Sequence, residues 1–142
     1  MIAVDTNILA RFYCDDPHDK QSKLQRPLAR RTLLESPSIF VPLTVVLELE
    51  WVMRGFYEFE PESFCQSMEH LLGMPHATVE RWEAVDDALH LHRQGLDFAD
   101  ALHLSCSSHC AKLVTFDDRG FVRRARKLKT GTEAVLPGNL FN

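Results

Sequence analysis

Short apolar runs alternate with longer stretches of helical periodicity along this chain. The first run, residues 1–4, leads directly into Asp5, and similar runs occupy residues 39–41 and 112–116. Runs without polar alternation are typical of strands in a parallel sheet that helices cover on both faces. The pattern therefore predicts a three-layer α/β/α domain with a central, mainly parallel sheet of four to five short strands.

Apolar residues recur at helical spacing between these runs. Helices are expected over residues 6–12, 20–35, 45–53, 62–72, 80–93, 97–106 and 119–129, and further strands over residues 77–79 and 132–136. Pro27 lacks a backbone donor, so the second of these helices is expected to be split into two pieces. Thr44 is expected to cap the third helix, because its hydroxyl can accept a bond from a free amide of the first turn.

Composition fits a single domain spanning residues 1–142. Of the 142 residues, 45% are hydrophobic and 25% are charged, which are ordinary globular values. No apolar run approaches the roughly 18 residues of a membrane span. No signal sequence precedes Ile2, so a cytoplasmic protein is expected. The net charge of −4 argues against indiscriminate coating of DNA, although basic residues crowd the segment 119–129.

The cysteines and histidines favour no zinc site. The cysteines are Cys14, Cys65, Cys106 and Cys110. They lack close CxxC pairing, and reduced thiols are expected in a cytoplasmic protein. His90 and His92 stand two residues apart and therefore cannot share a helical face.

Two acids stand directly beyond apolar strands, and a third lies in an apolar helix. Asp5 and Asp117 follow strands, at the end where ligands gather in open parallel sheets. Within the helix 45–53, Glu48 and Glu50 point about 160° apart, so only one can face a given site. Glu48 is favoured for its central place in the apolar stretch, and the alternative is a surface glutamate.

Asp100 is out of place among the small and apolar residues that flank it. Asp97, one turn earlier, is expected to cap this helix and to share its face with Asp100. The alternative is that Asp100, together with Asp97, only caps the start of the helix. Two carboxylates about 5 Å apart repel by roughly 3 kcal/mol at an effective dielectric near 20. A cluster of such acids would take up protons or bind a hard cation such as Mg²⁺.

Four motifs occur in a fixed order along the chain. They are Val-Asp-Thr-Asn at 4–7, Leu-Glu-Leu at 47–49, Asp-Phe-Ala-Asp-Ala-Leu-His-Leu at 97–104 and Leu-Val-Thr-Phe-Asp at 113–117. Together they resemble the PIN-domain ribonucleases, and the size of the chain is similar to that of the VapC-type toxins of toxin-antitoxin pairs. The resemblance implies a Mg²⁺- or Mn²⁺-dependent endoribonuclease that forms a homodimer and is inhibited by a small VapB-like antitoxin. It places the acidic site on Asp5, Glu48, Asp100 and Asp117.

The expected chemistry divides the acids by role. Asp5 and Asp100 are expected to bind the ion directly, while Glu48 and Asp117 contact it through water or hold a second ion. The metal would acidify a water and orient it in line with the scissile phosphorus, and Glu48 or Asp117 would take its proton. Asp118 is the alternative fourth acid.

Polar and basic residues near these acids are candidates for substrate contact. Asn7 and Thr115 are expected to position carboxylates or phosphate, although Thr115 can equally be an ordinary strand-end hydroxyl. Arg119 and Arg123 belong to the basic segment that is expected to meet the RNA backbone and to make binding salt-dependent. The alternative for that segment is a merely solvated helix.

Three other classes share part of this pattern. Haloacid-dehalogenase-type phosphatases carry Asp-x-Asp after the first strand. Here Asn7 replaces the second aspartate, so the general acid/base of that class is missing. A receiver-type signalling module needs an acceptor aspartate after a central strand, and residues 40–43 offer none. A PIN-like RNA-binding or assembly domain without turnover stays open, although a complete set of four acids argues against it.

Overall fold

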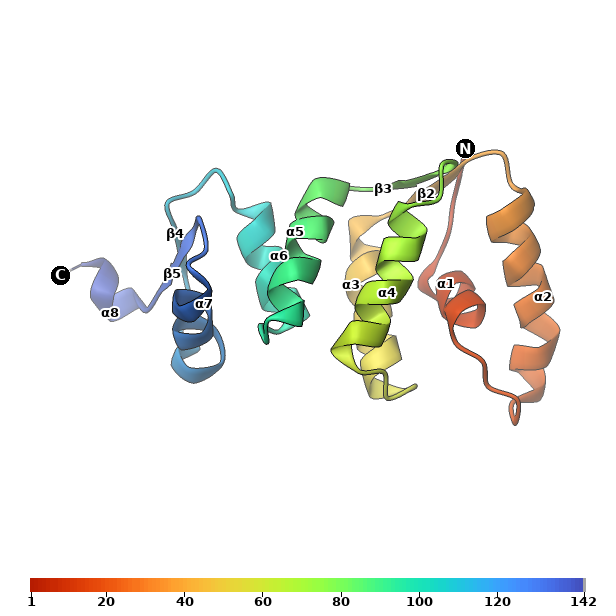
Figure 1. Ribbon diagram of the computed structural model, residues 1–142, viewed down its shortest axis with the longest axis horizontal. Coiled ribbons are helices and arrows are strands. Elements are labelled where there is room, and N and C mark those ends of the chain that lie inside the picture. Colours follow the sequence, from red (N-terminus) through yellow and green to blue (C-terminus); the bar gives the residue numbers. More distant parts are fainter. Residues whose placement is uncertain (142) are drawn as a thin grey trace. The chain divides into compact units, whose positions relative to one another are not determined.

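Short parallel strands alternate with helices throughout the structure (Figure 1). The computed structural model describes residues 1–141. These residues form two compact units, unit 1 with Met1–Trp82 and unit 2 from Glu83 onward. Among the described residues, no helix is both long and apolar enough to cross a membrane.

Residues 1–82, unit 1, form a parallel sheet whose strands are connected by pairs of helices. The strands, in sheet order, are β1 (Ile2–Ala3), β2 (Ile39–Val41) and β3 (Ala77–Val79). The helices are α1 (Thr6–Tyr13), α2 (Lys20–Glu35), α3 (Leu43–Gly55) and α4 (Pro61–Leu72). Helices α1 and α2 connect β1 to β2, and α3 and α4 connect β2 to β3, as expected for parallel neighbours.

The core of unit 1 consists of apolar side chains from the sheet and from one face of each helix. Among its fully buried members are Leu9, Leu33, Ile39, Leu49 and Met68. They come from α1, α2, β2, α3 and α4 in turn. Burying each such side chain contributes about 1.5–3 kcal/mol, so this core holds these five elements together.

Helix α2 runs unbroken through Pro27, so the expected division into two pieces is wrong. Proline leaves the carbonyl four residues earlier, that of Lys23, without a helical donor. Both Pro27 and Lys23 are exposed, and water can therefore satisfy this carbonyl without a break in the helix.

Helix α3 begins before the expected cap, and the capping role predicted for Thr44 is wrong. The N-cap residue is Pro42, whose side chain makes no capping bond. The free amide of Leu43 instead donates to Glu80 Oε1 at 3.1 Å. A carboxylate at the end of β3 thus satisfies one of the unpaired donors at the helix start.

Strand β1 is shorter and more exposed than expected. Only Ile2 and Ala3 pair with β2, and both are exposed. In the three-stranded sheet of unit 1, β1 is an edge strand. The buried residue of the run is Val4, which immediately precedes Asp5.

Unit 2 combines a helical pair with a second parallel strand pair. The helices α5 (Trp82–Arg93) and α6 (Phe98–Cys106) come first and are followed by β4 (Lys112–Val114). A π-helical turn, η1 (Asp118–Val122), continues as α7 (Arg123–Leu128) and leads to β5 (Glu133–Val135), which pairs with β4. The short α8 (Pro137–Leu140) was not expected.

The buried side chains of unit 2 come from α5, α6, η1 and β5, among other segments. They include Val85, Leu89, Phe98, Phe121 and Val135. The parallel pairing of all strands and their alternation with helices confirm the predicted α/β fold class. Among the described residues the strands number five, three in unit 1 and two in unit 2.

Candidate active site

Asp5 lies between the end of β1 and the start of α1. The amide of Val4 still donates to the Phe40 carbonyl at 3.1 Å, so the chain stays on the sheet until the residue before Asp5. Asp5 is the N-cap of α1, and its Oδ1 accepts the amide of Thr6 at 2.7 Å. The partial positive charge of a helix start stabilises such a carboxylate by about 0.3–1 kcal/mol. Asp5 therefore lies at the predicted place, fixed by the sheet before it and the helix after it.

Thr6 joins Asp5 to Glu48, the first through its amide and the second through its hydroxyl. Thr6 is buried, and its hydroxyl donates to Glu48 Oε1, 42 residues further along the chain. Asp5 and Glu48 line one pocket of about 310 Å³, together with Asn7. Three of the residues singled out in the sequence are thus brought together in unit 1.

Glu50, the other acid of α3, has a structural partner. Its side chain is only 4% exposed, and Arg54 Nε lies 2.9 Å from its Oε2. A buried carboxylate needs a cation or hydrogen bonds to offset its desolvation. The ion pair with Arg54 supplies this, and Glu48 is the glutamate of α3 that lines the pocket with Asp5.

The same pocket has further lining residues that sequence reasoning missed. They are Thr6, Ala10, Arg11, Val52, Phe56 and Tyr57. Arg11 Nη1 donates to the Tyr57 hydroxyl at 3.1 Å, and Arg11 Nε donates to Gln25 Oε1 at 3.0 Å. Its spacing of four residues from Asn7 was the available signal, because residues i and i+4 share a helical face.

In unit 2, Asp97 and Asp100 share the start of α6. Asp97 is the N-cap, and its Oδ2 accepts the amide of Asp100 at 3.3 Å, as predicted. Burial, and then the negative charges of Asp97 and Asp117, raise the pKa of Asp100 to about 6 against the opposing effects of His103 and Arg124. The charged form of Asp100 is therefore disfavoured unless a cation is near.

Asp117 is fixed by the residues on either side of it. Its amide donates to Thr115 Oγ1 at 3.1 Å, so Thr115 helps to position this acid. Its Oδ1 accepts the amide of Gly120 at 2.8 Å and thereby caps η1. A Cβ at position 120 would lie 2.7 Å from Asp117 Oδ2, so a glycine is needed for this close approach.

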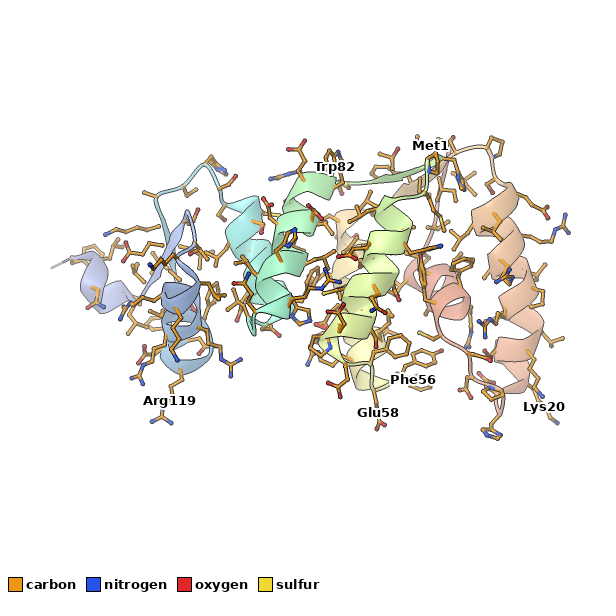
Figure 2. The ribbon with its side chains drawn as sticks, viewed as in Figure 1. Met1, Lys20, Phe56, Glu58, Trp82 and Arg119 are labelled. Carbon is orange, nitrogen blue, oxygen red and sulfur yellow. The ribbon has the colours of Figure 1, made fainter. Side chains whose placement is uncertain are left out.

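Asp118, the alternative fourth acid, is already paired. Arg123 Nη2 lies 2.9 Å from Asp118 Oδ2. Only Asp117, of these two acids, acts on the pKa of Asp100. Arg119 is exposed, and Figure 2 shows its side chain extending away from the ribbon of unit 2.

The cysteines and the histidine pair carry no sign of a metal site. The free cysteines among the described residues include Cys14 and Cys65, which are buried. His92 is buried with its Nδ1 2.8 Å from the Leu96 carbonyl oxygen, whereas the exposed His90 lies 3.8 Å from Asp86. The two histidines thus lie on different faces of α5, one buried and one exposed.

The predicted acids form two local groups. Unit 1 holds Asp5 and Glu48, and unit 2 holds Asp100 with Asp97 and Asp117. Within each unit, the described residues do not bring three His, Cys, Asp or Glu side chains around one point. Every donor in both groups is a carboxylate oxygen, a set that suits Mg²⁺ or Mn²⁺ rather than a soft metal.

Parallel strands that deliver carboxylates to the starts of helices define an α/β protein, and carboxylate oxygens are the ligands that hard divalent cations prefer. The PIN domain family matches residues 2–127, and the chain belongs to this family. The match extends across both units and includes all four predicted acids. PIN domains are generally metal-dependent nucleases. No curated protein matches the chain.

Proposed function

We propose that this chain is a Mg²⁺- or Mn²⁺-dependent endoribonuclease whose catalytic acids are Asp5, Glu48, Asp100 and Asp117. The observation that carries the proposal is the bridge through Thr6, which binds Asp5 by its amide and Glu48 by its hydroxyl. Two acids from separate family motifs are thereby held in one pocket. The proposal treats residues 1–142 as a single nuclease domain, in keeping with a family match that extends across both units.

The donor set supports a hard divalent ion. Asp5 and Asp100 are the proposed direct ligands, with Glu48 and Asp117 contacting through water or holding a second ion. When bound, the ion supplies positive charge for the substrate phosphate and lowers the pKa of a water. Zinc, which favours thiolate and imidazole ligands in structural sites, is not expected.

The side chains of the protein prepare the reaction in specific ways. Asp100 binds an ion as the carboxylate, so its pKa of about 6 means that metal binding should weaken as the pH falls below about 6. Glu48 is oriented by the Thr6 hydroxyl and is the proposed acceptor of the proton of the attacking water. Asn7 lines the pocket and is the proposed contact to a phosphate oxygen.

The basic segment supplies contacts to the RNA backbone. Arg119 is exposed, and Arg123 forms an ion pair with Asp118. Neither reads a base in this proposal, since phosphate contacts position a nucleic acid without specifying its sequence. Binding is therefore expected to weaken steeply with salt.

We also propose that this nuclease is the toxin of a VapBC-type pair, cytoplasmic and homodimeric, with a small VapB-like antitoxin as its partner. The support is the resemblance of the four motifs and the length of 142 residues. A neighbouring gene for a small DNA-binding protein is the expected companion. Co-expression should yield a complex of the two proteins whose formation suppresses cleavage.

The direct test is cleavage of a pool of structured RNAs with Mg²⁺ or Mn²⁺. Metal-dependent cutting is expected, and chelation or Asp5→Asn should abolish it. The matched control is Asp87→Asn, which removes an exposed acid of α5 and should cut normally. RNA binding without cutting would replace the proposal by a binding domain, and neither binding nor cutting would overturn it.

A further inference from the structure

The pocket beside Asp5 and Glu48 changes character along α3. Glu48, Val52 and Phe56 line it and lie about one helical turn apart in succession, so its lining passes from a carboxylate to an aromatic ring. The pocket also includes Tyr57. Its volume is about 310 Å³, at the small end of the range of ligand pockets, which is roughly 300–1,000 Å³. A pocket of this size suits one nucleotide rather than a base pair.

Arg11 makes the wall of this pocket rigid. Its side chain is only 18% exposed, and its Nη2 lies 3.4 Å from Asp19 Oδ2. Further bonds to Gln25 and to the Tyr57 hydroxyl fix the remaining nitrogens of the guanidinium. The loop after α3 is thereby tied to α1 and α2. Tyr57 is held in place before any ligand arrives, which lowers the ordering cost of binding.

Phe56 is an exposed aromatic ring on this rigid support. It is 69% exposed, and its ring meets that of Tyr57 edge to face, at 4.8 Å and 74°. Tyr57 in turn contacts Phe59 in the same manner, at 6.5 Å and 71°. Figure 2 shows Phe56 close to Glu58, where α3 ends. An edge-to-face contact covers at most one flat face of the Phe56 ring, so at least one face is free of Tyr57.

We propose, on the basis of the nuclease function above, that Phe56 is the platform on which a base of the RNA stacks. The lining of the pocket matches the two parts of a nucleotide. Its carboxylates suit a metal-bound phosphate, and its aromatic residues suit a base. Stacking on an aromatic side chain requires a base that is unpaired and turned out of a helix. Phe56 therefore selects unpaired nucleotides and sets where the strand is cut.

Kinetics on a short single-stranded RNA test this assignment. Loss of one aromatic stacking platform corresponds to about a 5- to 150-fold loss of affinity. Phe56→Leu should therefore raise KM by this factor with kcat nearly unchanged, and Phe56→Trp should keep KM close to the wild-type value. The matched control is Trp51→Leu, because Trp51 is an exposed aromatic residue of α3 that does not line the pocket. Thermal melts confirm that each variant is folded.

A binding measurement separates this proposal from the nuclease function itself. An RNA that carries 2-aminopurine loses fluorescence when the base stacks, and Asp100→Asn allows binding to be followed without the cleavage. Phe56→Leu in that background should abolish the quenching, whereas Trp51→Leu should not. If quenching depends on Phe56 but the wild type cuts no RNA, the base subsite stands and the nuclease does not.

Two results would overturn the stacking role. One is a wild type that cuts RNA together with a Phe56→Leu variant that has the same KM and the same cleavage positions. The other is a Phe56→Leu variant that loses only the binding of a protein partner, which would make Phe56 an anchor for that partner.

Discussion

At the scale of single residues, Asp100 shows most directly what the acid cluster costs the folded protein. Burial and then the charges of Asp97 and Asp117 raise its pKa from 3.8 to about 6. The folded state therefore binds the proton more tightly than the unfolded state does. The stability that this group contributes is complete below about pH 4 and is lost as the pH rises through about 6.

Asp100→Asn should consequently stabilise the metal-free protein at neutral and higher pH. The variant stays uncharged, so its melting temperature should exceed that of the wild type near pH 8, and the difference should vanish near pH 4. Thermal melts with a chelator at both values measure this. Asp87→Asn serves as the control, and an equal gain at both values would contradict the electrostatic explanation.

Thr6 has a different kind of influence, because it acts through the hydrogen bond to Glu48. Thr6→Val keeps the shape of this buried side chain and removes the hydroxyl. Losing such a partner of a functional carboxylate typically lowers activity by about 10- to 100-fold. The free energy of unfolding should fall by only about 1 kcal/mol. Thr44→Val, at an exposed position of α3, should change neither kcat nor the melting temperature.

At the scale of elements, the turn from β4 into η1 depends on the absence of a side chain at position 120. A Cβ there would lie 2.7 and 2.9 Å from the carboxylate oxygens of Asp117, so Gly120→Ala has to displace that carboxylate. The expected result is a loss of activity of about 10- to 100-fold in a protein that still folds. Gly138→Ala is the control, because nothing lies within 4 Å of its added Cβ. Normal activity in Gly120→Ala would remove Asp117 from the mechanism.

The same turn illustrates what sequence patterns can and cannot predict about elements. An acid directly after an apolar run has to lie near the end of a strand, and both Asp5 and Asp117 do. The capping of α3 by Glu80 and the bonds of Arg11 to Gln25 and Tyr57 join residues far apart in sequence. Local periodicity contains no information on such partners.

Helix α2 and the aromatic lining of the pocket show two further limits of the same kind. Pro27 does not split α2, because whether a proline breaks a helix depends on what its free carbonyl meets. The sequence did not identify Phe56 as a pocket residue, because an aromatic residue after a helix is usually interpreted as part of the core. Its exposure and its neighbours, rather than its type, distinguish it.

At the scale of the whole molecule, a net charge of −4 coexists with a basic segment around α7. Attraction to RNA should therefore come from a few local contacts. Arg119→Gln should weaken binding about equally for all RNA sequences and reduce the dependence of log Kd on log salt by about 1. Lys20→Gln, at the opposite end of the sequence, should leave that slope unchanged. Equal effects of the two variants would mean that the basic segment has no special role.

The largest question at this scale is whether the acids of the two units bind the same ion. The proposal makes Asp5 and Asp100 ligands of one metal, so either single substitution to Asn should remove most of the Mn²⁺ affinity. The loss should exceed the roughly 10- to 100-fold that follows removal of a ligand's hydrogen-bond partner. The double variant should then be little worse than either single one, because groups that act as one unit are not additive. Titration calorimetry with Mn²⁺ gives both affinity and stoichiometry for all three variants. Two independent sites would instead leave each single variant with one ion bound at wild-type affinity, and the acids of unit 1 and unit 2 would then need separate explanations.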